Sequence, residues 1–166
     1  MSETSVPQRI LFVCLGNICR SPTAEGMLRQ RLAQLGLEER VEVDSCGTGA
    51  WHVGDPPDPR AIEAASARGI DISGLRGRQL ASEDFATCDE ILVMDAANLA
   101  DVAARKPANA RAQVLRLMAY AGQPDADVPD PYFGGEAGFL YALDQIEAAV
   151  DGVATALMRR MAVDDA

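Results

Sequence analysis

The chain has 166 residues and a formal net charge of −10, from 15 Lys and Arg against 25 Asp and Glu. Hydrophobic residues make up 48% and charged residues 24%, as in ordinary globular domains, which argues against a disordered or fibrous chain. A strongly acidic chain repels a phosphate backbone at long range, so we expect no nucleic-acid partner. No apolar run approaches the roughly 20 residues of a membrane span, and residues 1–8 lack the apolar region of an export signal.

The four cysteines, Cys14, Cys19, Cys46 and Cys88, are too few to form a disulfide scaffold. Without an export signal, we expect these thiols to stay reduced, as in a cytoplasmic protein. The chain has one histidine, His52, so the sequence offers no cluster of metal ligands. These features predict a cytoplasmic protein that uses no metal or cofactor and does not associate with a membrane.

Short apolar runs of the kind found in buried parallel strands alternate with helical patterns along the chain. In chain order, the sequence predicts a strand at 9–13, a helix at 21–35, a strand at 41–43, a helix at 60–68, a helical turn at 82–85, a strand at 90–94, a helix at 95–104, a strand at 113–117 and a helix at 136–161. Gly and Pro predict long loops at 47–59 and 119–135.

Strands that alternate with helices form right-handed crossover units. We therefore predict an α/β fold of three αβα layers around a four-stranded parallel sheet. The sequence shows no internal repeat or linker, so we expect a single domain at 9–161, with tails at 1–8 and 162–166. In such a fold, the loop after the first strand lies at the carboxyl edge of the sheet, where ligands bind.

That loop reads Cys14-Leu15-Gly16-Asn17-Ile18-Cys19-Arg20-Ser21. Backbone N–H groups of a loop that leads into a helix can converge on an anion, and the helix dipole adds a positive field. Arg20 offers a planar fork for two phosphate oxygens, and the same field favours a Cys14 thiolate placed to attack phosphorus. The spacing alone also fits a buried cysteine and a structural arginine. The strand before the loop and the helix after it favour the phosphate site.

A thiolate nucleophile needs a proton donor for the leaving oxygen. Asp130 is a candidate because Pro129 and Pro131 stiffen the backbone on both sides of it. A simple Asp-Pro turn explains this segment equally well. His52 is a poorer candidate, because a lone histidine in a Gly/Pro-rich loop is more often an ordinary surface residue.

With these residues, the sequence resembles the low-molecular-weight protein tyrosine phosphatase family. The resemblance rests on residues 13–22, Asp44-Ser45-Cys46-Gly47, Trp51, Pro57-Asp58-Pro59-Arg60, Val93-Met94-Asp95 and Asp130-Pro131-Tyr132-Phe133. It implies a metal-free, two-step phosphatase acting on phosphotyrosine-containing proteins. In this resemblance Cys14 is the nucleophile, Arg20 the phosphate clamp and Asp130 the general acid.

The same resemblance assigns further residues to the site. Asn17, Ser21 and Ser45 would brace the phosphate loop, which Leu15, Gly16, Ile18 and Cys19 complete, and Trp51, Tyr132 and Phe133 would form the walls of the substrate cleft. From the residues alone, Gly16 permits an unusual backbone conformation and Asn17 tolerates a left-handed one. Ser21 fits a helix N-cap as well as a partner of the thiolate.

Two loop residues carry further implications. Family members that hydrolyse phosphoarginine carry Thr at the position of Ile18, so Ile18 favours phosphotyrosine. In the family, a cysteine at the position of Cys19 can form a reversible disulfide with the nucleophile. A small residue that packs in the loop explains Cys19 equally well.

Two alternatives remain at this stage. An arsenate reductase shares the fold but needs further redox cysteines, and Cys88 stands without a partner in the later segment. A non-catalytic phosphate-binding module would keep Arg20 and the loop but would gain nothing from Cys14 and Asp130 together. The sequence makes no prediction of the oligomeric state.

Overall fold

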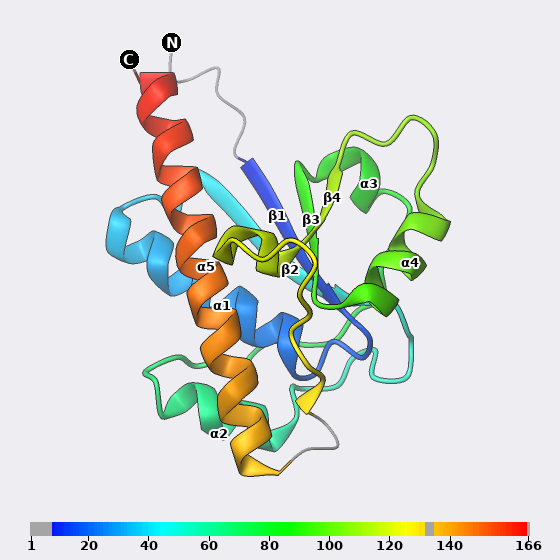
Figure 1. Cartoon of the computed structure of the whole chain (residues 1–166), viewed down its shortest axis with the longest axis vertical. Coiled ribbons are helices and arrows are strands. Elements are labelled where there is room, and N and C mark those ends of the chain that lie inside the picture. The colour runs from blue at the N-terminus through cyan, green and yellow to red at the C-terminus, as the bar shows by residue number, and fades with distance from the viewer. Residues whose placement is uncertain (1–7, 132–134, 166) are drawn as a thin grey trace.

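A single parallel sheet forms the middle layer of the protein (Figure 1). The computed structural model describes residues 8–131 and 135–165. The strands are β1 (Gln8–Cys14), β2 (Val41–Gly47), β3 (Glu90–Val93) and β4 (Gln113–Arg116). They lie in the order β2-β1-β3-β4, and Phe12 of β1 is level with Ser45 of β2 and Leu92 of β3. This register places the carboxyl ends of the two central strands side by side.

Helices cover both faces of the sheet, which confirms the predicted αβα layers (Figure 1). The helices are α1 (Arg20–Leu35), α2 (Pro59–Ser66), α3 (Asp84–Thr87), α4 (Ala96–Arg105) and α5 (Glu136–Asp165), with a 3-10 helix η2 (Leu117–Ala121). Ile10 and Phe12 of β1 are buried in the cluster formed with α1 and α5, whereas Leu11 and Val13 pack against the α3 and α4 side. This alternation explains why residues 10–14 of β1 are all apolar. Over the described residues, none of the helices is long and apolar enough to cross a bilayer.

The two end elements reach beyond the predicted domain limits. β1 begins at Gln8, whose N–H donates to the carbonyl of Arg40 at 3.1 Å. α5 continues past residue 161 to Asp165. Arg160 of α5 donates to the side chain of Gln8 at 3.2 Å, so the start of β1 is tied to the last turns of α5.

Residues 117–121 form η2, where the sequence predicted a strand end and a loop. Tyr120 explains the difference, because its hydroxyl donates to the buried Glu90 of β3 and accepts from Arg160 of α5 at 3.0 Å. Arg160 also pairs with Glu90 at 2.7 Å. Burial, together with the Glu90 carboxylate, raises the pKa of Tyr120 to about 12. These long-range contacts fix a turn that the local sequence leaves open.

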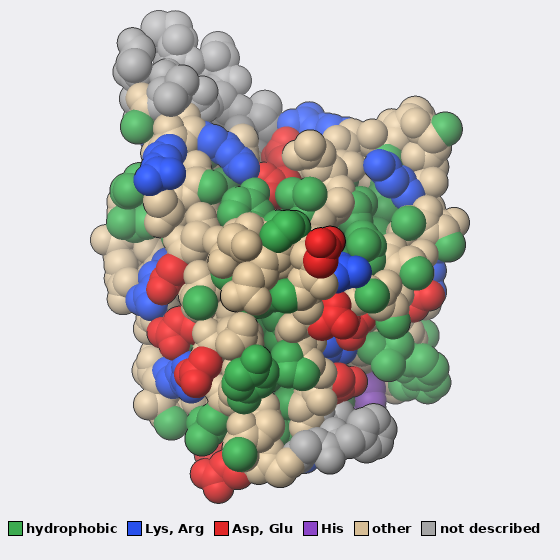
Figure 2. All heavy atoms as spheres, in the orientation of Figure 1, with side chains coloured by type: hydrophobic (Ala, Val, Ile, Leu, Met, Phe, Trp, Pro, Cys, Tyr) green, Lys and Arg blue, Asp and Glu red, His purple; other side chains and the backbone are tan. Residues whose placement is uncertain are grey.

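Charged side chains on the surface are largely paired. Figure 2 shows acidic side chains beside basic ones at several places on one face. Arg31 of α1 pairs with Asp151 of α5 at 2.5 Å, and Arg68, which follows α2, pairs with Asp144 of α5 at 2.8 Å. The long helix α5 is therefore held against the rest of the protein by ion pairs along its exposed edges as well as by the packing of its apolar face.

α5 passes so close to η2 that a Cβ at Gly152 would lie 2.0 Å from the carbonyl oxygen of Tyr120. We expect Gly152→Ala to lower the free energy of unfolding, because the clash, about 1–3 kcal/mol, outweighs the gain in helix propensity. Gly138→Ala in the same helix is the control, since no described atom lies within 4 Å of its Cβ. It should be neutral or stabilising by up to about 1 kcal/mol. Urea unfolding of both variants tests this, and a Gly152→Ala protein as stable as wild type would contradict the close approach.

Candidate active site

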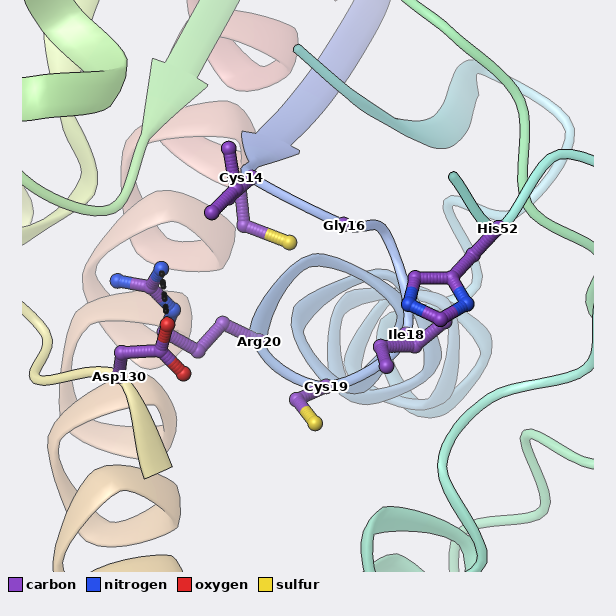
Figure 3. A pocket seen from close by; sticks show the side chains of 8 residues that line it. Cys14, Gly16, Ile18, Cys19, Arg20, His52 and Asp130 are labelled. Carbon is purple, nitrogen blue, oxygen red and sulfur yellow. Dashed lines mark ion pairs between the residues drawn. The ribbon is translucent and has the colours of Figure 1, made fainter. Parts of the chain in front are cut away.

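A pocket opens at the carboxyl edge of the sheet, where the loop of residues 15–19 joins β1 to α1 (Figure 3). Its lining residues are Cys14, Leu15, Gly16, Ile18, Cys19, Arg20, His52 and Asp130. They come from three segments that are far apart in the chain: the phosphate loop predicted from the sequence, the loop before α2, and the segment before α5. The structure therefore brings the three residues predicted to be catalytic into one pocket.

The sulfur of Cys14 lies at the base of this pocket and is hydrogen-bonded. The N–H of Asn17 donates to Sγ at 3.3 Å, and the hydroxyl of Ser21 lies 3.0 Å from it. The cysteine itself is 3% exposed. Hydrogen bonds to a sulfur favour its anionic form, so this setting suits a thiolate.

The helix-cap alternative for Ser21 is wrong. α1 begins at Arg20, its N-cap residue is Cys19, and no side chain caps it. Ser21 therefore lies inside the first turn, and its hydroxyl turns back to Cys14. The first N–H groups of a helix lack intrahelical partners, so an uncapped N-terminus leaves donors available at the loop.

Asn17 holds the loop in shape through three hydrogen bonds. Its backbone is left-handed, with φ of 57°. Its amide nitrogen donates to the hydroxyls of Ser21 at 2.8 Å and Ser45 at 3.0 Å, and its Oδ1 accepts from the N–H of Arg78 at 3.0 Å. Ser45 in turn donates to the buried carboxyl of Glu25 at 2.7 Å, and burial raises the pKa of Glu25. This network keeps a strained residue in a single conformation.

Two glycines let other segments approach the loop closely. A Cβ at Gly47, the end of β2, would lie 2.7 Å from the carbonyl oxygen of Leu15. A Cβ at Gly16 would lie 3.3 Å from the ring of His52. Of the described loop residues, Asn17 has the positive φ and Gly16 does not. Gly16 is therefore not needed for an unusual backbone conformation, as the sequence suggested; its lack of a side chain instead leaves room for the ring of His52.

Arg20 is buried and oriented by two acceptors. Its Nη1 donates to Oδ2 of Asp95 at 2.7 Å and to the carbonyl of Val128 at 2.8 Å. Both hydrogens of Nη1 are then used, which leaves the edge formed by Nε and Nη2 for a ligand. Nη2 lies 3.7 Å from Oδ2 of Asp130, and Figure 3 shows this carboxylate facing the guanidinium.

Asp95 is a residue of the site that the sequence analysis assigned no role. It follows β3 and caps α4, with Oδ1 accepting from the N–H of Asn98 at 2.8 Å. Its other oxygen holds Arg20. The position of an Asp directly after a buried strand was the available signal, because all carboxyl ends of a parallel sheet meet at one edge.

Cys19 is a second buried cysteine in the lining of the pocket. Burial raises the pKa of Cys19 to about 12, and the carboxylates of Asp58 and Asp130 contribute. Its thiol therefore stays protonated at neutral pH. All four cysteines are free thiols, and Cys46 and Cys88 are buried on the opposite face of the sheet, where burial raises the pKa of both.

The predicted cleft walls are only partly described. Tyr132 and Phe133 lie outside the described residues. Trp51 is 73% exposed, its ring packs over Gly49, and it is not among the residues that line the pocket. His52, which the sequence analysis set aside as an ordinary surface residue, lines the pocket instead. A single histidine in a loop carries no periodic signal, so its contact with Gly16 could not be read from the sequence.

Together, the parallel sheet and a strand–loop–helix that holds a cysteine, an arginine and an opposed aspartate define the cysteine-dependent class of α/β phosphatases. A sequence model of the low molecular weight phosphotyrosine protein phosphatase family matches residues 9–163. The chain belongs to this family, as its motifs predicted.

Individual relatives agree with this assignment. A low molecular weight phosphotyrosine protein phosphatase of Schizosaccharomyces pombe is 47% identical over 133 residues, 79% of this chain and 85% of the relative. A putative low molecular weight protein-tyrosine-phosphatase of Synechocystis is 41% identical over 155 residues, 92% and 98% of the two chains.

Solved structures show the same fold. The protein tyrosine phosphatase of Entamoeba histolytica superposes with a TM-score of 0.86 at 33% identity, covering 93% of this chain and 99% of that chain. An arginine phosphatase of Drosophila superposes with a TM-score of 0.82 at 32% identity, covering 89% and 96%. The fold is thus shared by enzymes named for two different phosphorylated residues.

The contacts of Asp95 predict that it positions Arg20 for anion binding. Asp95→Ser keeps a helix-capping oxygen but removes the carboxylate from Arg20, so phosphate should bind about tenfold more weakly, the effect of one charge-assisted hydrogen bond. Asp95→Asn keeps a neutral acceptor for Arg20, so its affinity for phosphate should fall less than that of Asp95→Ser. Calorimetric titration with inorganic phosphate measures both, and denaturant unfolding reports the cap separately. If Asp95→Ser lost stability but bound phosphate as tightly as wild type, Asp95 would act as a helix cap alone.

Proposed function

We propose that the protein hydrolyses phosphotyrosine in proteins through a cysteinyl-phosphate intermediate formed on Cys14. The observation that carries this proposal is the sulfur of Cys14, hydrogen-bonded by Ser21 and Asn17, in one pocket with Arg20 and Asp130. This arrangement supplies a nucleophile, an oxyanion clamp and a proton donor within a single small site.

In the first step, the thiolate of Cys14 attacks phosphorus. The S–P bond forms as the bond from phosphorus to the tyrosyl oxygen breaks, and Asp130 gives its proton to the departing phenol. The edge of the Arg20 guanidinium formed by Nε and Nη2 holds two phosphoryl oxygens, since Asp95 and Val128 already occupy Nη1. Preorganised donors of this kind contribute most where charge builds up in the transition state.

In the second step, water replaces the thiolate. Asp130, now ionised, takes a proton from a water that attacks phosphorus, the S–P bond breaks, and inorganic phosphate leaves with Cys14 restored as a thiolate. The side chain of Asp130 is 38% exposed, so water can reach it. The hydrogen bonds to Sγ stabilise the leaving thiolate as they stabilise the attacking one.

The pocket favours an aryl substrate. Ile18 places a half-buried apolar side chain in the lining, opposite Asp130, and Leu15 is exposed at the mouth. Apolar walls suit a phenyl ring better than a guanidinium group. The residue at position 18 therefore supports phosphotyrosine over phosphoarginine, although two structural relatives are named arginine phosphatases.

Cys14→Ser tests the nucleophile and the substrate together. We expect wild type to release phosphate from phosphotyrosine peptides in preference to phosphoserine and phosphoarginine peptides. Cys14→Ser should lose turnover because a serine hydroxyl in this setting is not ionised, but it should still bind inorganic phosphate. Phosphate release and calorimetry measure the two properties. Retained hydrolysis would refute the role of Cys14, and a preference for phosphoarginine would refute the substrate.

Asp130→Ala tests the proton donor. Loss of a general acid should slow phosphotyrosine hydrolysis by about 10²- to 10⁴-fold, because the tyrosyl oxygen then leaves as an anion. The loss should be smaller with p-nitrophenyl phosphate, whose more acidic phenol leaves without help. Steady-state kcat for the two substrates gives the comparison. Equal losses would argue that Asp130 acts through Arg20 and not as an acid.

A further inference from the structure

His52 lies on a rigid turn at the rim of the pocket. The N–H of Asp55 donates to the carbonyl of His52 at 3.0 Å, which closes the turn. Two bonds with Gly77 fix the turn from behind: the N–H of Gly54 donates to Gly77 at 2.9 Å, and the N–H of Gly77 donates to Asp55 at 2.8 Å. A Cβ at Gly77 would lie 2.3 Å from the carbonyl oxygen of His52, so the two backbones are in close contact.

The ring of His52 is oriented as well. Nδ1 lies 3.2 Å from Oδ2 of Asp55, and a carboxylate accepts, so Nδ1 carries the proton of this bond. In the neutral ring, Nε2 is then an acceptor. Figure 3 shows the ring beside Ile18, on the pocket side of its loop and across the pocket from Arg20 and Asp130.

The groups around His52 divide the pocket into two sides. The other charged lining groups, Arg20 and Asp130, lie together at one side, within 3.7 Å of each other. On the other side, the ring of His52 lies beside the half-buried apolar side chain of Ile18. His52 therefore offers a polar ring nitrogen next to an apolar part of the lining.

We propose that His52 is a specificity-determining residue whose Nε2 accepts a hydrogen bond from a main-chain N–H of the substrate beside the phosphotyrosine. The proposal rests on the proposed function. With phosphate at the base of the pocket and the phenyl ring against Ile18, the peptide backbone must cross the rim. An oriented acceptor there recognises any polypeptide, whatever its side chains. The enzyme would then distinguish phosphotyrosine within a protein from a free aryl phosphate.

The test compares two substrates with the same kind of phenol leaving group: a short phosphotyrosine peptide, and phenyl phosphate, which has no main chain. The measured quantity is the ratio of their kcat/KM values. His52→Phe keeps an aromatic ring against Gly16 but removes the nitrogen, and should lower this ratio about fivefold, the effect of one neutral hydrogen bond. The loss should be mainly in KM. His52→Gln, whose side-chain oxygen can accept in place of Nε2, should restore part of the ratio.

A second substrate identifies the donor. The second substrate is a depsipeptide in which ester oxygens replace the main-chain N–H groups on both sides of the phosphotyrosine. With wild type, its kcat/KM should be about fivefold lower than that of the peptide, whereas with His52→Phe the two substrates should have the same kcat/KM. If His52→Phe leaves the ratio unchanged, or lowers kcat/KM equally for both substrates, the proposal is overturned while the proposed function stands. If wild type hydrolyses neither phenyl phosphate nor the peptide, both the proposed function and this proposal are wrong.

Discussion

The buried, hydrogen-bonded position of the Cys14 sulfur is the constraint on which the rest of the site depends. Hydrogen bonds stabilise a sulfur in a buried position, and here its partners are the N–H of Asn17, which donates at 3.3 Å, and the hydroxyl of Ser21 at 3.0 Å. Both depend on the left-handed backbone of Asn17, which Ser45 and Arg78 hold from two other segments. The fold thus maintains a loop conformation that the loop would not keep by itself.

Charge at the site is arranged locally, against the sign of the whole chain. The chain carries a net charge of −10, and the proposed phosphate clamp is one buried arginine oriented by Asp95. Paired in this way, Arg20 keeps one edge of its guanidinium for the ligand and is spared the cost of an unpaired buried charge. Most surface charges are engaged in short ion pairs, and screening by salt limits the reach of the remaining ones. Short-range contacts can therefore decide anion binding.

The two sides of the pocket suggest separate tasks. In the proposed mechanism, Arg20 and Asp130 act on the phosphoryl group and its leaving oxygen, and Asp95 holds Arg20 by a hydrogen bond. In the same proposal, Ile18 and His52 face the part of the substrate that does not react. Separating recognition from chemistry lets contacts at the rim change substrate choice without disturbing the groups that act on phosphorus.

The sequence by itself determined the layered fold, the strand–loop–helix at residues 9–35 and the identity of Cys14, Arg20 and Asp130 as candidates. The fold and the loop follow from local periodicity and from a short motif, in which spacing along the chain fixes spacing in space. Asp130 follows from its flanking prolines and from the family resemblance. Tertiary structure decided that Ser21 faces the sulfur, that residues 117–121 coil into η2, that Asp95 holds Arg20 and that His52 lines the pocket. Those placements depend on strand register and on glycines that admit a second backbone, contacts between residues far apart that no local pattern records.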